Sequence, residues 1–279
     1  MKKVLFIADF YRQELLGGAE SNDANLIKYL STRCDLVCCK SRSLTKEDIK
    51  NADSVIVSNF IDMPEELKDN IRESKSYIIY EHDHKYVKTR DPSVFINSVA
   101  PRNMIINEDF YIKAKAVVVL SKICKEILEK NIPEASVHNI GCSLWSKETF
   151  DYIEALSTRE KTEDLCIMKS SNPWKNYDKA LEYCTHNSIS PVELESPNYR
   201  KFLEQMSSCK RFLFLPGLLE TFSRVSAEAK MMGLSLLTTP KKLGFCSEEI
   251  HKLSGIELIN KLRKRNEQAL VKFEELLEL

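Results

Sequence analysis

The segment LLETFSRVSAEAKMMG, Leu218–Gly233, follows the apolar run RFLFLPG and carries two glutamates, Glu220 and Glu228, eight residues apart. On one continuous helix these side chains would stand about 80° apart and would not share a face. Apolar side chains recur at helical spacing, at Phe222, Val225, Ala229 and Met232. The pattern therefore predicts a helix that begins near Thr221 or Phe222, with Thr221 as a candidate N-cap and Glu220 in the preceding loop.

Two interpretations of this segment stay open on spacing alone. In the first, the backbone amides of Phe222, Ser223 and Arg224 point out of the positive end of the helix, which favours a phosphate there. Glu228, two turns in, would then accept paired hydrogen bonds from vicinal hydroxyls, as on a ribose. In the second, Glu220 is a capping acid and Glu228 is a solvated acid on an ordinary helix.

The rest of the chain alternates short apolar runs with helical patterns. Runs rich in Val, Ile and Leu are typical of parallel strands covered on both faces, and the alternation predicts right-handed βαβ units in doubly wound sheets. The pattern predicts an α/β protein of two units joined by a linker, 1–147 and 148–279, with a helical tail from Ser247. The expected strands are Lys3–Ala8, Asp35–Cys39, Ser54–Ser58, Ser76–Tyr80, Ala116–Leu120, Leu165–Lys169, Pro191–Leu194, Arg211–Pro216 and Leu234–Pro240.

Composition limits the class of protein. The chain has 279 residues and a formal net charge of zero, so no global field attracts nucleic acid or an acidic membrane. No apolar segment approaches the roughly 20 residues that span a bilayer, and the N-terminal VLFIA is interpreted as a buried strand rather than a signal peptide. Nine scattered cysteines fit reduced thiols. We therefore expect a cytoplasmic protein, with peripheral membrane contact left open.

Two further stretches carry candidate ligand-binding residues. In GGAE, Gly17 and Gly18 follow the first strand and allow close backbone approach to a ligand, although GG is also common in ordinary loops. Because this is not a full G-x-G-x-x-G, NAD binding is disfavoured. In YEHDHKY, His82 and His84 follow a strand at the edge where α/β ligand crevices form, and would point the same way in extended chain. A structural role for these histidines is the alternative, and a metal site lacks an evident third ligand.

The chain resembles the retaining family-4 glycosyltransferases, also called glycosyl transferases group 1. The resemblance lies in E-x(7)-E continued as ETFSRVSAEA, and in GGAE, AKAVVVLSKICKEIL, VHNIGCSLWSKETF, MKSSNPWKNYDKALEYC and KKLGFCSE in the same order. It extends to about Glu249. It implies the GT-B fold, with two Rossmann-like domains around a central cleft, the first on the acceptor side and the second binding a nucleotide sugar.

The resemblance also implies roles for particular residues. Gly17 and Gly18 would lie against the donor phosphate and sugar, and His82, with His84 as the alternate, near the transferred sugar. Glu220 would contact sugar hydroxyls, and Glu228 the ribose. The remaining donor-binding candidates are Lys169, Lys175, Thr221, Phe222, Ser223 and Arg224. Two departures stand out: Lys169 replaces an arginine and follows Met168 instead of a glycine, and Ser223 occupies a position that is commonly glycine.

The expected activity is transfer of a sugar from a UDP- or GDP-linked donor with retention, by positioning and electrostatics, with no cofactor and no metal. No D-x-D motif is present to suggest a metal. The default acceptor is a saccharide or glycan precursor, and a lipid-linked saccharide or modified DNA bases are alternatives. Two other functions stay open: a GT-B module that binds a nucleotide sugar without turnover, and a nucleotide-sugar epimerase.

Overall fold

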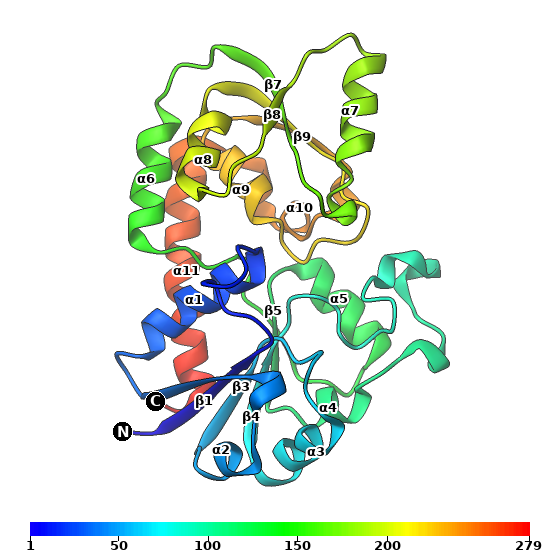
Figure 1. Cartoon of the computed structure of the whole chain (residues 1–279), viewed down its shortest axis with the longest axis vertical. Coiled ribbons are helices and arrows are strands. Elements are labelled where there is room, and N and C mark those ends of the chain that lie inside the picture. Colours follow the sequence, from blue (N-terminus) through cyan, green and yellow to red (C-terminus); the bar gives the residue numbers. More distant parts are fainter. The chain divides into compact units, whose positions relative to one another are not determined.

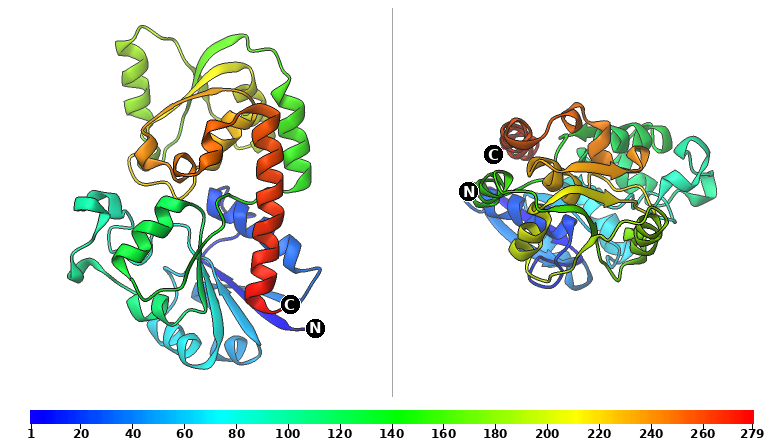
Figure 2. Two further views of the ribbon diagram at one scale, coloured as in Figure 1. Left: turned by 180° about the vertical axis from the view of Figure 1, so that it is seen from behind. Right: turned by 90° about the horizontal axis from the view of Figure 1, so that it is seen from above.

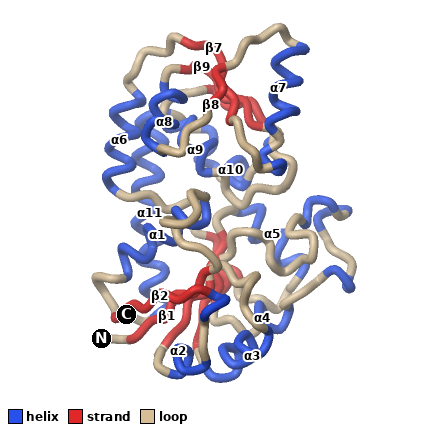
Figure 3. The backbone as a smooth tube through the Cα atoms, in the orientation of Figure 1, coloured by secondary structure: helices blue, strands red, loops and turns tan.

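The computed structural model describes residues 1–279, which divide into two compact units (Figure 1). The first unit comprises Met1–Leu144 together with Arg265–Leu279, and the second comprises Trp145–Lys264. The end of the helical tail therefore clusters with the first unit, whereas the sequence division kept the whole of 148–279 in one domain. Each unit is built on its own parallel sheet with flanking helices, drawn red and blue in Figure 3.

The first unit contains a six-stranded parallel sheet in the order β2-β1-β3-β4-β5-β6. Its strands are β1 (Lys3–Ala8), β2 (Asp35–Lys40), β3 (Ser54–Val57), β4 (Ser76–Tyr80), β5 (Ala116–Val119) and β6 (Val137–Asn139). Strands β3 and β5 are buried at every position, as the runs of Val and Ile predict. Strand β2 lies at an edge and is largely exposed, so the expectation of two covered faces is wrong there.

Five helices belong wholly to the first unit: α1 (Gly18–Leu30), α2 (Lys46–Lys50), α3 (Glu65–Ser74), α4 (Glu108–Ile112) and α5 (Lys122–Asn131). Ser121 precedes α5 at the predicted N-cap position, but its side chain makes no capping hydrogen bond. Helix α1 buries Glu20, Asn22 and Asp23 beside Leu26 and Leu30, so its buried face is unusually polar.

The second unit contains a four-stranded parallel sheet in the order β10-β9-β7-β8. The strands are β7 (Glu163–Met168), β8 (Val192–Leu194), β9 (Cys209–Phe214) and β10 (Ser235–Thr238). The helices wholly in this unit are α6 (Lys147–Ser157), α7 (Tyr177–His186), α8 (Tyr199–Ser207), α9 (Arg224–Met231) and α10 (Gly244–Ser247). Leu165, Ile167 and Leu213 of the sheet pack with Ala180 and Cys184 of α7 in a small apolar core.

The last helix, α11 (Gly255–Leu277), passes from the residues of the second unit into those of the first at Arg265. In the first unit its Phe273 ring packs edge-on against Tyr80 of β4, with ring centroids 4.9 Å apart. The two termini lie close together (Figure 2), and Lys2 Nζ donates to the carbonyl oxygen of Leu277 at 2.6 Å. No helix combines the length and apolar character that a membrane span requires.

Candidate functional site

In the second unit, Glu220 lies in a loop that is fixed to distant backbone. Its N–H donates to the Lys242 carbonyl at 3.0 Å, and its carbonyl accepts from the Gly244 N–H at 2.9 Å, so Glu220 and Leu243 form an isolated parallel bridge. The prediction that Glu220 precedes the helix is confirmed, since α9 begins only at Arg224. This backbone pairing holds the carboxylate in place without any helix of its own.

Lys175 is the charged partner of Glu220. Its Nζ lies 2.7 Å from Glu220 Oε1 and 5.8 Å from the centre of the Phe214 ring. The loop that carries Lys175 is joined to the loop after β9, because the Gly217 N–H donates to the Trp174 carbonyl at 2.9 Å. The structure therefore brings these two predicted site residues together at the carboxyl ends of β7 and β9, the edge where α/β proteins bind ligands.

Lys169 has different partners. It follows β7, and its Nζ lies 3.1 Å from Glu195 and 3.5 Å from Glu193, acids on and just after β8. Of the two predicted lysines, only Lys175 forms an ion pair with a glutamate of the E-x(7)-E segment.

The start of α9 differs from the prediction. The N-cap is Ser223, not Thr221, and the helix begins at Arg224. Ser223 has φ 73° and ψ 80°, a left-handed conformation that favours glycine, and its Oγ lies 2.8 Å from Ser226 Oγ. The amides of the first turn consequently begin at Arg224, so the amides of Phe222 and Ser223 do not belong to the helix. The backbone at this position has a conformation that favours glycine, although the residue is serine.

Phe222, expected among the donor-binding residues, has a buried side chain. Its ring packs against Phe245 at 5.6 Å and Trp145 at 6.2 Å between ring centroids. The Phe245 N–H donates to the Phe222 carbonyl at 2.8 Å. Phe222 thus anchors the approach to α9 in the core of the second unit.

Glu228 is buried, with 2% of its surface exposed, so its interpretation as a solvated acid is wrong. Oε1 accepts hydrogen bonds from Trp145 Nε1 at 2.8 Å and Tyr199 Oη at 2.6 Å, and Arg224 lies 3.6 Å away. The Arg224 guanidinium also stacks 4.7 Å above the Trp145 ring. Burial, followed by the Glu228 charge, raises the pKa of the Tyr199 hydroxyl, which keeps Tyr199 a donor.

Trp145 and Tyr199 were missed by the sequence reasoning. Trp145 lies in the linker stretch VHNIGCSLWSKETF and Tyr199 at the start of the helical pattern NYRKFLEQMSSC, and neither stretch marks its aromatic residue as part of a polar site. The available signal was that a buried tryptophan or tyrosine needs an acceptor for its polar hydrogen. Glu228 is such an acceptor.

In the first unit, Gly17 is the N-cap of α1 with φ −105°, so no left-handed backbone requires glycine there. A Cβ on Gly17 would overlap the Glu20 carboxylate, the far end of a flexible side chain, which would have to move. Burial raises the pKa of this Glu20 carboxyl. Gly17 and Gly18 therefore sit beside a buried carboxylate at the start of α1.

His82 belongs to a buried polar cluster at the carboxyl edge of the first sheet. Its Nε2 lies 3.2 Å from Asp23 Oδ1, and the Ser58 hydroxyl donates to the same carboxylate at 2.7 and 2.8 Å. The Tyr80 ring packs against the imidazole at 4.2 Å. Sequence reasoning missed Asp23 and Ser58, which sequence places far from His82.

His84 faces elsewhere. Its φ is 54°, so the segment is not extended and the expectation that both histidines point the same way is wrong. The ring lies 3.0 Å from Tyr86 Oη and 4.0 Å from Cys124 Sγ, and burial lowers its pKa. The pKa of the neighbouring Glu81 carboxyl is about 2. Burial alone would raise this pKa, but the charge of Lys85 and the hydrogen bond from the Tyr111 hydroxyl lower it by more.

Comparisons with known proteins agree with this architecture. The sequence matches no protein-family model and no curated protein. Among solved structures, Anabaena HepE in complex with UDP and glucose matches at 12% identity and a TM-score of 0.54, over 99% of this chain and 100% of that one. An alpha-glucosyltransferase in complex with UDP and a 13-mer DNA containing a central A:G mismatch matches at 10% identity and a TM-score of 0.52, over 97% of this chain and 90% of that one.

These likenesses concern the fold. With its two parallel-sheet units and helical C-terminal tail, the chain has the GT-B fold that the sequence predicted.

Proposed function

We propose that the protein is a glycosyltransferase that moves a sugar from a UDP- or GDP-linked donor to an acceptor, with retention at the anomeric carbon and without a metal ion or cofactor. The GT-B fold is compatible with this activity, and solved structures that share the fold contain UDP. The resemblance of the E-x(7)-E segment to retaining family-4 enzymes supports the finer assignment.

The observation that carries the proposal is the arrangement around the two glutamates. Glu220 and Lys175 are paired at 2.7 Å at the carboxyl edge of the second sheet, and Glu228 is buried eight residues further on. Burying a carboxylate costs folding free energy unless the charge is paired and hydrogen-bonded. Here three side chains gather on one of its oxygens, Oε1. A ribose diol could bond to the other oxygen.

The proposed roles follow from the chemistry of the side chains. Lys175 would leave Glu220 for the diphosphate, which frees the carboxylate to accept hydrogen bonds from sugar hydroxyls. Arg224 would be a second cation for the phosphates, as would Lys169, and Thr221 and Ser223 would contribute through their backbone. Positive charge fixed near the leaving diphosphate stabilises the transition state more than the ground state.

For the first unit, we propose that Gly17 and Gly18 lie close to donor phosphate and that His82 contacts the transferred sugar. Asp23 would hold the imidazole of His82 in one orientation. His84 is buried against Tyr86 and Cys124 and is the weaker candidate.

The acceptor that we propose first is a saccharide or glycan precursor. DNA with modified bases is the second candidate, because one solved structure of the same fold is an alpha-glucosyltransferase in complex with UDP and a 13-mer DNA containing a HMU base. A base inside a duplex would have to be flipped out for transfer.

The test is release of nucleoside diphosphate by the full-length chain. UDP-glucose, UDP-N-acetylglucosamine and GDP-mannose would be supplied in turn, with an oligosaccharide mixture, with DNA carrying hydroxymethylated bases, or with no acceptor. Glu220→Ala should lower acceptor-dependent release at least about 100-fold, as expected for loss of a group that contacts the reacting sugar. Glu182→Ala, at an exposed acid on α7, is the matched control.

Acceptor-dependent release that is unaffected by Glu220→Ala would refute the assignment of the site. Binding of a donor without any release would favour a module without turnover. Conversion of the donor sugar without an acceptor would favour an epimerase.

A further inference from the structure

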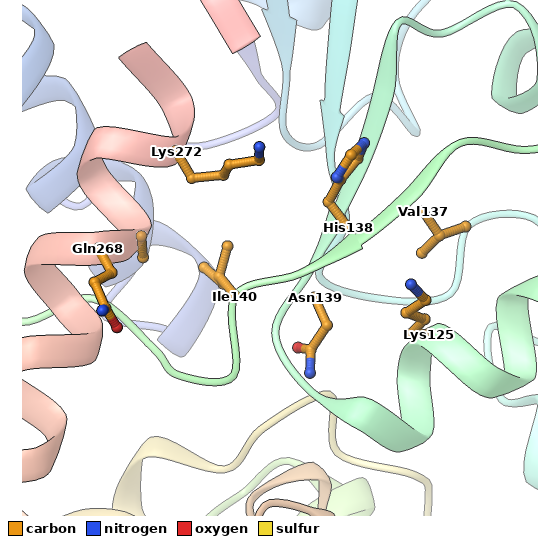
Figure 4. A pocket seen from close by; sticks show the side chains of 8 residues that line it. Lys125, Val137, His138, Asn139, Ile140, Gln268 and Lys272 are labelled. Atoms are coloured by element: carbon orange, nitrogen blue, oxygen red, sulfur yellow. The ribbon is translucent and has the colours of Figure 1, made fainter. Parts of the chain in front are cut away.

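A cavity in the first unit is lined by none of the candidate site residues considered so far. It has a volume of about 410 Å³ and is bounded by the edge strand β6, helix α5 and the part of α11 beyond Arg265 (Figure 4). Cavities of roughly 300–1,000 Å³ are those that take small molecules. The lining residues are Lys125, Val137, His138, Asn139, Ile140, Gln268, Ala269 and Lys272.

The lining has a charge bias that the whole chain lacks. It contains two lysines, a histidine and two carboxamides, but no carboxylate. The complete chain has 41 basic and 41 acidic residues. The lysines come from different walls, Lys125 from α5 and Lys272 from α11 (Figure 4). Positive charge is thus presented to the cavity from two elements.

Both lysines have only weak partners. Lys125 Nζ lies 3.6 Å from Glu129, and Lys272 Nζ lies 3.0 Å from Glu275, each within its own helix. Exposed pairs of this kind contribute about 0–1 kcal/mol. Neither glutamate lines the cavity, so an anion inside it could compete for both ammonium groups.

The pKa of His138 responds to the charges of both lysines. Partial burial, followed by the charges of Lys272 and Lys125, lowers the pKa of its imidazole. Its Nε2 lies 3.3 Å from Ser136 Oγ. An anion that binds beside these lysines would offset their charge at His138 and favour the protonated imidazole.

The strand itself adds hydrogen-bonding capacity. Strand β6 ends the sheet order, so no strand pairs with its outer edge. The Val117 N–H donates to the Ser136 carbonyl, and the Ile140 N–H donates to the Val119 carbonyl. Because bonding alternates along a parallel strand, the intervening Val137 backbone faces the outer edge and the cavity.

We propose that this cavity binds a phosphate monoester, held by Lys125 and Lys272 with His138 as a third donor. Lysine is a common phosphate ligand, and a dianion matches the two ammonium charges. The carboxamides of Asn139 and Gln268 would bond to the remainder of the ligand. The phosphate could belong to a soluble metabolite or to a lipid headgroup.

The experiment follows the five histidines of the full-length chain by NMR during pH titrations. Millimolar inorganic phosphate is compared with chloride at equal ionic strength. Phosphate should raise the apparent pKa of His138 by about one unit, because it stabilises the imidazolium. Exposed His186 should not respond. Without phosphate, Lys272→Gln should also raise the pKa of His138, since it removes a positive charge.

Variants decide whether the response belongs to the cavity. Lys125→Gln and Lys272→Gln should abolish the effect of phosphate, Lys272→Arg should retain it, and Lys122→Gln, on the same helix as Lys125, should leave it intact. A response of His138 no larger than that of His186, or one that survives both glutamine variants, overturns the proposal. Glycerol 3-phosphate and vesicles of phosphatidic acid in phosphatidylcholine then distinguish the soluble source from the lipid source.

Discussion

Replacing Glu228 by glutamine separates a ligand-binding carboxylate from a structural one. The side chain keeps its size, and its amide oxygen can still accept from Trp145 and Tyr199, as Oε1 does now at 2.8 and 2.6 Å. The change removes the charge. If the other oxygen accepts hydrogen bonds from the two hydroxyls of a ribose, glutamine places an amide NH2 group there, which donates and cannot accept, so both bonds are lost.

The magnitude follows from the loss of two hydrogen bonds to a charged acceptor. Each such bond contributes about 1.5–3 kcal/mol, so the two together contribute at least about 3 kcal/mol. Their loss corresponds to a Kd for UDP that is weaker by roughly 150-fold or more. Isothermal titration calorimetry with UDP measures this directly.

Two control variants isolate the effect. Trp145→Phe removes one donor to Oε1 without changing the charge. Because the buried indole also loses packing, this variant should lower the free energy of unfolding by more than about 1 kcal/mol, while leaving the Kd for UDP within about threefold. Glu182→Gln, at an exposed acid in the same unit, should change neither quantity. If Glu228→Gln lowers stability but leaves the Kd for UDP unchanged, the carboxylate is structural and the proposed ribose contact is wrong.

Three further predictions concern stability, each measured by urea unfolding. Because its pKa is lowered to about 2, ionised Glu81 stabilises the fold above pH 4.5, the ordinary pKa of a glutamate, and this stabilisation is lost as the pH falls toward about 2. Glu81→Gln should therefore flatten the dependence of the free energy of unfolding on pH in this range. An unchanged slope would contradict the pairing with Lys85. Ser223→Gly should raise the free energy of unfolding by up to about 1 kcal/mol, because it relieves the left-handed strain at φ 73°; a clear loss would show that the serine hydroxyl matters more than the backbone. Gly17→Ala should displace the Glu20 carboxylate, which the new Cβ would otherwise overlap. The effect of Gly17→Ala on stability should disappear when Glu20 is also replaced by alanine. Additive effects of the two changes would contradict the contact.

The sequence predicted nine of the ten strands, most of them from apolar runs that are typical of buried parallel pairing. It missed β6, which is only Val137–Asn139 with one apolar residue among three. This strand exists because Val137, His138 and Asn139 pair with β5. Pairing with a distant partner leaves no local periodicity, so nothing in the three residues could have indicated it.

Candidate site residues were recognised by type, but their contacts were not. The sequence motif pointed to both Lys175 and Glu220, yet the ion pair that joins them spans 45 residues. The burial of Glu228 could not be predicted for a related reason. Helical spacing places Glu228 outside the apolar face of its own helix, but Trp145 and Tyr199, which come from other segments, contact its carboxylate. Periodicity describes one helix and cannot show what packs on its other face.

At the start of α9, packing rather than side-chain capping preference decides which residue begins the helix. Thr221 is a good N-cap by its side chain, but the helix starts after Ser223 in a left-handed conformation that costs a non-glycine residue about 1–3 kcal/mol. The surroundings impose this geometry: the Phe222 ring is buried against Trp145 and Phe245, and its carbonyl accepts from the Phe245 N–H. Because strain persists only where neighbouring structure fixes it, the left-handed turn forms at Ser223 although the residue is not glycine. This turn sets the backbone between Glu220 and Glu228, which is the part of the second unit that the proposed donor would contact.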